Sequence, residues 1–249
     1  MDYSEYGGEV NYLLSKLNLT KEEVIHAYVH YDLDIFAYEN EIYESLAMRM
    51  VLYLHYLLKG SWHQDRQDSI LRIVEKIKPK SIIDMGFGAP TKYIRNYVLN
   101  NKIKTTLADL YESAFEFSKA LFDYLESSWK DFISFKQIDM NTHEYPGDFD
   151  CYIFQDSIEH VNNSTEYLNK LVEESPRDSK FIFSLPIGPI MSVHTINWDT
   201  EEEAVKWLEG SGLRAVNPEK AFINKEVDLF AEQIKEEFYN LIVICEKQN

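Results

Sequence analysis

Hydrophobic residues in the first third of the chain recur at the spacing of helices. Leu13 and Leu17 lie four positions apart, so one helix face would carry both side chains. Thr20 and Glu23 then form the Thr-x-x-Glu pattern of a capping box, which predicts the start of another helix. The whole segment Tyr12–Lys78 therefore predicts helices.

Two longer apolar stripes continue this helical segment. The first stripe is predicted to stop at Gly60. The second is predicted to end before Pro79, because the residue that precedes a proline disfavours the helical conformation. The stripes consist of Ile42, Leu46, Met50, Leu54 and Leu57, and of Ile70, Ile73, Val74 and Ile77.

After Pro79 the pattern changes to short apolar runs that alternate with helical segments. The runs predict strands at Ser81–Met85, Lys104–Ala108, Ile133–Gln137, Cys151–Gln155, Phe181–Leu185 and Leu241–Glu246, with a weaker strand at Leu213–Val216. The segments between them predict helices at Thr91–Leu99, Ser113–Ser127, Ser164–Glu174 and Glu201–Glu209. This alternation predicts an α/β fold, a mostly parallel sheet with helices on both faces. Ligands of such sheets bind beyond the carboxyl ends of the strands.

Composition narrows the class of protein. The chain has 249 residues, of which 45% are hydrophobic and 14% aromatic, enough for a well-packed core. The formal net charge of −17 disfavours nucleic acid and anionic membrane surfaces as partners. Cys151 and Cys245 lie in apolar runs, which indicates reduced core residues of a cytoplasmic protein. The first ten residues are too acidic and polar for a secretion signal, and Leu46–Leu58 is too short to span a bilayer.

The segment Ser81–Pro90 carries the most specific motif. It predicts a strand that ends in Asp84, followed by a turn containing Gly86 and Gly88. Glycines in a strand–turn–helix unit let the backbone approach a nucleotide closely. Asp109 follows about 20 residues later at the end of the second predicted strand, where an acid accepts hydrogen bonds from ribose hydroxyls.

Two further strand ends carry polar residues in the same order. Asp139 and Met140 follow the third strand, and Gln155 ends the fourth, shortly before Glu159 and His160. Together with the glycine turn, these segments resemble the class I S-adenosylmethionine-dependent methyltransferases over roughly residues 80–247. The resemblance implies a Rossmann-like, seven-stranded sheet with an antiparallel strand near its C-terminus, and S-adenosyl-L-methionine as the cofactor.

The resemblance also implies a role for each strand end. Asp84 would lie near the methionine amine, and Gly86 and Gly88 would admit the cofactor. Asp109 would hold the ribose. The adenine would contact Asp139 and Met140, and the methionine moiety would contact Gln155. The family pattern usually has a third glycine where this chain has Pro90, which lacks an N–H donor.

The proposed reaction transfers a methyl group to an N, O or C nucleophile of a small molecule. Residues 1–78 would form a helical cap that contacts this acceptor, and residues 79–249 the cofactor-binding core. His194 and His160 are the candidate bases for an acceptor that must lose a proton. No metal site is predicted, because His26 and His30, four apart on a helix, have no suitable third ligand nearby.

Three other functions stay open. An aminocarboxypropyl transferase would use the same cofactor, and a NAD-dependent oxidoreductase would use a similar sheet. A binding protein could keep the fold without activity, and Pro90 is the one sign of an altered cofactor turn. Formation of a homodimer is also left open.

Overall fold

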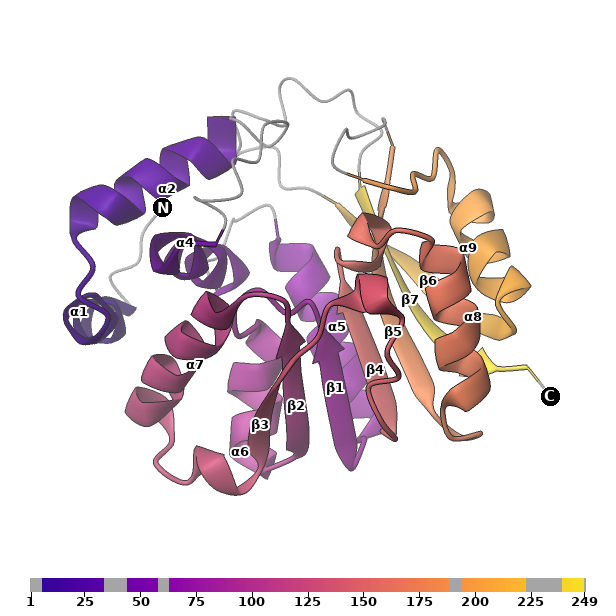
Figure 1. Ribbon diagram of the computed structural model, residues 1–249, viewed down its shortest axis with the longest axis horizontal. Helices are drawn as coiled ribbons and strands as arrows, with labels where there is room; N and C mark the ends of the chain where they lie inside the picture. Colours follow the sequence, from indigo (N-terminus) through magenta and orange to yellow (C-terminus); the bar gives the residue numbers. More distant parts are fainter. Residues whose placement is uncertain (1–5, 34–43, 58–62, 189–193, 223–238, 249) are drawn as a thin grey trace.

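The computed structural model describes residues 6–33, 44–57, 63–188, 194–222 and 239–248. Within these residues seven strands form one sheet in the order β3-β2-β1-β4-β5-β7-β6 (Figure 1). The strands are β1 (Ser81–Met85), β2 (Lys104–Asp109), β3 (Ile133–Gln137), β4 (Cys151–Gln155), β5 (Lys180–Ile187), β6 (Leu213–Phe222) and β7 (Tyr239–Lys247). β1 to β5 are parallel to one another, and β7 pairs antiparallel with both β5 and β6. The predicted fold class is confirmed, including its antiparallel strand.

The C-terminal strands are longer than their apolar runs predict. β5 and β7 pair from Lys180 opposite Glu246 to Ile187 opposite Tyr239. The weak strand predicted at 213–216 continues to Phe222 as β6 and pairs with β7 beyond a bulge. Pairing with β7 extends the edge strand β6 beyond its apolar residues, because the hydrogen bonds between the strands form through the backbone.

Eight α-helices and one π-helical turn surround this sheet among the described residues. They are α1 (Gly7–Lys16), α2 (Lys21–Leu33), α4 (Leu46–Leu57), α5 (Gln64–Ile77), the π-helical turn η2 (Ile94–Val98) with α6 (Leu99–Asn101), α7 (Glu112–Leu125), α8 (Ser164–Glu174) and α9 (Glu201–Gly210). Short 3-10 turns follow at η3 (Trp129–Asp131), η4 (Met140–Thr142) and η5 (Ile158–His160).

The sheet separates two hydrophobic clusters. Successive strand residues point to opposite faces, so Ile82 joins one cluster and Ile83 the other. The first cluster packs under α5, η2 with α6, and α7, while the second packs under α8 and α9. Helices thus cover both faces, as the alternating pattern predicts.

The N-terminal helices begin and end largely where the sequence indicates. The backbone N–H of Glu23 donates to Thr20 Oγ1 at 3.2 Å, and that of Thr20 donates to the Glu23 carboxylate at 2.7 Å, which confirms the capping box. α5 ends at Ile77, and Lys78 takes a left-handed conformation before Pro79. Ile42 and Gly60 lie outside the described residues.

The helix predicted at 91–99 contains an irregular turn. It begins at Lys92, and over Ile94–Val98 it widens to a π-helix, in which the Leu99 N–H bonds to the carbonyl five residues earlier. Such turns insert one residue into a helix and are frequent near functional sites. Hydrophobic periodicity does not reveal one, because a single inserted residue shifts the apolar stripe only slightly.

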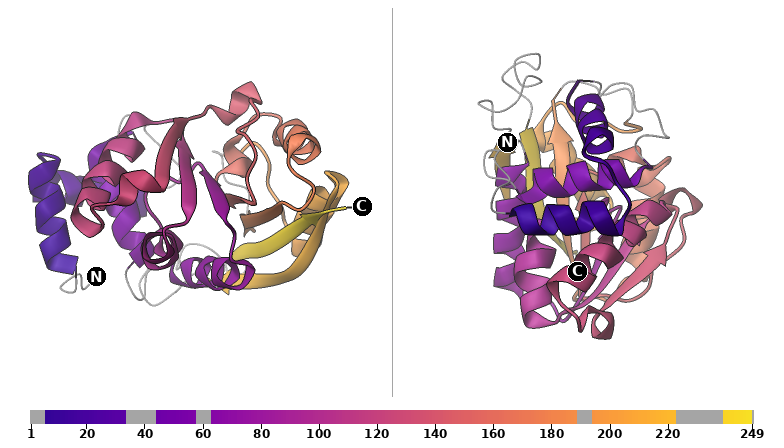
Figure 2. Two further views of the ribbon diagram at one scale, coloured as in Figure 1. Left: turned by 90° about the horizontal axis from the view of Figure 1, so that it is seen from below. Right: turned by 90° about the vertical axis from the view of Figure 1, so that its left-hand side faces the viewer.

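The N-terminal helices form a group at the β3 side of the molecule. α4 contacts α2, α5 and α7, and α1 contacts α7. Figures 1 and 2 show α1, α2 and α4 gathered at this end of the molecule. α5 contacts β6 and β7 instead, so it joins the helical layer on the sheet. The division at residue 78 stays a prediction. No described helix is long and apolar enough to cross a bilayer.

Replacing Ile70 tests whether α5 belongs to the core. Ile70→Ala should lower the free energy of unfolding by about 2–5 kcal/mol, because this fully buried side chain leaves a cavity. Ile25→Ala on α2 is the control, since Ile25 is 60% exposed. Urea denaturation would measure both, and equal effects would contradict the packing described for α5.

Candidate functional site

A cavity of about 450 Å³ opens at the carboxyl ends of β1, β2, β3 and β4. This is the edge of the sheet at which the sequence places the chemistry. Five residues of the predicted site line the cavity, namely Gly86, Asp109, Asp139, Met140 and His160. Four others do not line it in the part of the chain that the structure describes: Asp84, Gly88, Gln155 and His194.

The two glycines of the turn serve different neighbours. Both have positive φ, 71° at Gly86 and 64° at Gly88, which side chains rarely adopt. A Cβ on Gly86 would lie 2.8 Å from Ser157 Cβ, and Ser157 Oγ donates to the Met85 carbonyl at 2.7 Å. Gly88 instead faces α4, where the nearest atom to an added Cβ belongs to Leu52. Gly86 thus borders the cavity, and the absence of a side chain at Gly88 lets α4 pack closely against the turn.

Asp109 fastens the glycine turn to the end of β2. One carboxylate oxygen accepts from the Gly88 N–H at 2.9 Å, and the other from the Tyr111 N–H at 2.9 Å. The side chain is buried, yet the residue lines the cavity. Its carboxylate is therefore fixed in place at the position from which a ligand hydroxyl can be reached.

Asp84 lies beneath the turn and is fully buried. Its Oδ2 accepts hydrogen bonds from Tyr93 Oη at 2.8 Å and from Gln155 Nε2 at 3.0 Å. Gln155 in turn accepts from Gln67 of α5 at 3.0 Å. Burial raises the pKa of Asp84 to about 7, although these two hydrogen bonds lower it. The network joins β1, β4, α5 and the helix after the turn.

Asp139 has a local role as well as its place in the cavity wall. Its carboxylate accepts from the Asn141 N–H at 2.9 Å and caps η4. Both Asp139 and Met140 are half-buried and line the cavity. Asp139 therefore caps η4 and also stands at a position open to a ligand. The cofactor roles of all these residues stay predictions.

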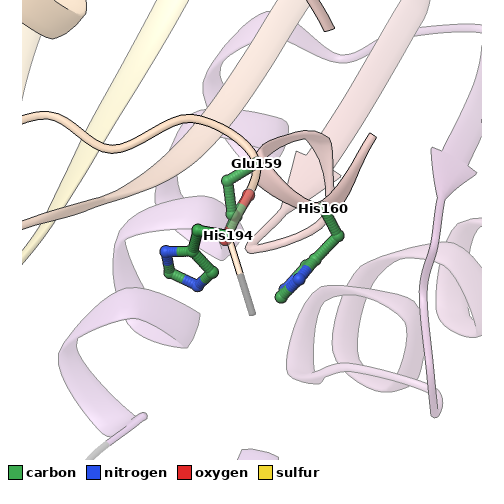
Figure 3. Close-up of side chains that lie close together, drawn as sticks. All are labelled: Glu159, His160 and His194. Atoms are coloured by element: carbon green, nitrogen blue, oxygen red, sulfur yellow. The ribbon is translucent and has the colours of Figure 1, made fainter. Parts of the chain in front are cut away.

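His160 and His194 meet at the rim, beside Glu159. Their rings lie 4.9 Å apart in an edge-on arrangement, and Figure 3 shows the three side chains converging from two segments. Thr195 binds these segments together, because its N–H donates to the Glu159 carbonyl at 2.7 Å. Burial and the neighbouring His160 lower the pKa of His194 to about 4.

Sequence reasoning overlooked two arginines from the N-terminal helices. Arg49 Nη1 donates to the Gly88 carbonyl at 3.4 Å, and its guanidinium lies over the Tyr111 ring. Arg66 forms an ion pair with Asp156, which lines the cavity and has a positive φ of 49°. Arg49 interrupts an apolar helical stripe, and a charge in such a stripe is the signal that could have indicated a buried polar contact.

Asp156 is held from three sides. Besides Arg66, it accepts hydrogen bonds from Ser184 Oγ at 2.6 Å and Asn240 Nδ2 at 2.7 Å. These partners come from α5, β5 and β7. The end of β4 is therefore tied to three neighbouring elements, which fixes the cavity wall that continues to Ser157 and His160.

Comparison with known proteins shows the fold. No family model matches the sequence, and no curated protein is significantly similar to it. Among solved structures, the magnesium protoporphyrin IX methyltransferase of Synechocystis, with S-adenosylmethionine bound, superposes with a TM-score of 0.55 at 13% identity, covering 91% of this chain and 97% of that one.

Two other solved structures extend this comparison. The 1,6-didemethyltoxoflavin-N1-methyltransferase of Burkholderia thailandensis, bound to its substrate and S-adenosylhomocysteine, gives a TM-score of 0.54 at 17% identity, covering 81% of this chain and 90% of that one. The [4+2]-cyclase SpnF gives 0.59 at 12% identity, covering 78% and 85%.

The chain has the Rossmann-like fold of the class I S-adenosylmethionine-dependent methyltransferases. The resemblance drawn from the glycine turn and the later strand ends is confirmed at the level of the fold. At sequence identities of 12–17%, these superpositions establish the fold and do not indicate a specific activity.

The raised pKa of Asp84 predicts a pH-dependent stability. An ordinary aspartate releases its proton near pH 3.8 in the unfolded chain, whereas the folded protein keeps this proton up to about pH 7. The contribution of Asp84 to stability is therefore fully present below about pH 4 and is lost as the pH rises to about 7. The loss amounts to roughly 4 kcal/mol at most, at about 1.4 kcal/mol per pKa unit.

Asp84→Asn should remove this part of the pH dependence, because the amide oxygen still accepts from Tyr93 and Gln155 but does not titrate. Urea unfolding at pH 5 and pH 8 would compare the variant with the wild type. Asp178→Asn, at an exposed position, should leave the difference unchanged. An equally large loss in Asp84→Asn would show that other groups cause it.

Proposed function

We propose that this protein is an S-adenosylmethionine-dependent methyltransferase that acts on an N, O or C nucleophile of a small molecule. One observation carries the proposal: the cavity lies between the glycine turn after β1, the acid that ends β2 and the acid that follows β3. An elongated nucleoside cofactor needs a close backbone approach at one end and an acceptor for its ribose hydroxyls at the other.

In this proposal Asp109 holds the ribose, and Asp139 with Met140 borders the adenine. Gly86 lets the cofactor approach the backbone. Asp84 and Gln155 would affect the methionine moiety indirectly, by positioning the turn. They lie beneath the turn and are hydrogen-bonded to each other at 3.0 Å. They act as its support in the ligand-free protein.

The reaction would be an in-line displacement at the sulfonium methyl group. The cofactor supplies an activated methyl donor, so the chain mainly has to align the acceptor and exclude water. His160 lines the cavity and His194 lies beside it, so these imidazoles are the candidate groups to receive a proton from the acceptor. The acceptor itself would enter beside them, at the β4 end of the cavity.

Charge and composition support the rest of the proposal. A net charge of −17 favours a small acceptor over nucleic acid. Cys151 and Cys245 are buried free thiols, which agrees with a cytoplasmic location. Solved methyltransferases of this fold act on small molecules such as didemethyltoxoflavin, whereas SpnF is a cyclase, so the reaction has to be identified from its products.

Asp109→Ala tests the cofactor site. The affinity for S-adenosylhomocysteine should fall about 10- to 100-fold, since a hydrogen bond to a charged group is worth about 1.5–3 kcal/mol. Calorimetric titration would measure it, with NADH expected to bind far more weakly to the wild type. Asp178→Ala is the matched exposed control.

Asp109 also bonds to Gly88, so the thermal unfolding of the variant must be recorded. Asp109→Asn, which keeps one acceptor oxygen, should give an intermediate loss. Unchanged affinity in a folded Asp109→Ala protein would refute the ribose assignment. Incubation of the wild type with S-adenosylmethionine and candidate acceptors then identifies the reaction: S-adenosylhomocysteine indicates methyl transfer, and methylthioadenosine indicates transfer of the aminocarboxypropyl group.

A further inference from the structure

Glu159 is a buried carboxylate that the proposed methyl transfer does not use. Its side chain is fully buried, and no described residue forms a hydrogen bond to either carboxylate oxygen. The turn places it next to His160, and the segment after β5 brings His194 to the same point. One ligand atom from each of these three residues lies within 4.8 Å of the others.

To be ionised, a carboxylic acid in this position needs a compensating positive charge. Burying an acid without hydrogen bonds is costly, and the two residues beside it offer imidazole nitrogens. We propose that Glu159, His160 and His194 bind a divalent first-row transition-metal ion. Two imidazoles and one carboxylate suit Zn²⁺, Mn²⁺, Fe²⁺ or Co²⁺, and three protein ligands leave coordination positions open.

The separations are close to those of a bound site. Ligand atoms lie about 2.0–2.2 Å from such an ion, so two of them can be at most about 4.4 Å apart. The observed limit of 4.8 Å means that small rotations of the side chains bring the set together. His160 is exposed and His194 half-buried, so both imidazoles have room to turn.

The backbone holds the two ligand segments in register. Besides its N–H, Thr195 uses its hydroxyl, which lies 2.9 Å from the Glu159 carbonyl and 2.7 Å from that of Val161. Glu159 and His160 are consecutive residues of η5, directly after the Asp156 position that α5, β5 and β7 fix. Thr195 is thus a positioning residue, because its hydrogen bonds fix the backbone next to His194.

The ion would narrow the class of acceptor, and this step rests on the proposed function. His160 lines the cavity, so the open coordination positions would face the acceptor. A hydroxyl oxygen bound to the ion loses its proton more easily. That oxygen then forms the bond to the methyl carbon while the carbon–sulfur bond breaks, S-adenosylhomocysteine leaves, and the proton passes to bulk water. The acceptor would be an oxygen nucleophile, and both histidines would be ligands instead of bases.

Cobalt binding tests the site without any cofactor or acceptor. Chelator-treated protein is titrated with Co²⁺, followed by calorimetry and by visible absorption. The wild type should bind one ion at this site, and His194→Ala and Glu159→Gln should each weaken that binding at least about 100-fold, more than loss of an indirect partner of a ligand. Thr195→Val should weaken it about 10-fold through position alone.

The control is the double variant His26→Ala/His30→Ala, which removes another pair of close imidazoles, whose rings lie 4.5 Å apart on α2. It should keep the cobalt spectrum. Thermal unfolding without metal shows whether each variant is folded, and His194→Ala decides the question if Glu159→Gln is not.

Two results would overturn the proposal: no cobalt binding by the wild type, or cobalt binding of undiminished affinity in folded His194→Ala. S-adenosylhomocysteine affinity is measured separately on metal-free protein. Cobalt binding without cofactor binding would therefore refute the methyltransferase function and support the metal site. Cofactor binding without cobalt binding would refute the metal site and support the cofactor-binding function.

Discussion

The cavity depends on two acids that hold the glycine turn from different sides. Asp109, at the end of β2, accepts a hydrogen bond from the Gly88 N–H of the turn, and Asp84, inside the sheet, accepts one from Tyr93 in the helix that follows the turn. Because parallel strands end at one edge, hydrogen bonds between neighbouring strand ends decide whether that edge is ordered enough to bind a ligand. Here the side chains that border the opening are fixed before any ligand arrives. Such preorganisation lowers the ordering cost that binding would otherwise carry.

The same order continues into the helices before the sheet. Arg49 reaches the Gly88 carbonyl, Gln67 reaches Gln155, and Arg66 pairs with Asp156. Each of these contacts joins a buried polar group of a helix to a strand end. Polar contacts in a low-dielectric interior are strong when fully satisfied, and they fix one arrangement where apolar packing would tolerate several. The helices thereby support the strand ends next to the cavity.

The sequence was sufficient for the fold because the signals were local. Each parallel strand is a short apolar run, and the capping box at Thr20 needs only two residues to be recognised. The site was partly predictable for the same reason, since Asp109 ends β2 and Asp139 lies two residues after the end of β3. The arginine contacts and the meeting of Glu159 with His194 depend on residues far apart in the chain, and no periodicity encodes them. The π-turn and the extension of β6 beyond Val216 were not predicted, because backbone hydrogen bonds, not the side-chain pattern, produce them.

The contact between Gly86 and Ser157 changes what the glycine pattern can reveal about other chains. The space that a side chain at position 86 would need is already taken by Ser157. A descendant that had lost its ligand altogether would still require glycine there, since the crowding comes from its own β4 turn. The glycine therefore reports how two neighbouring strand ends are packed.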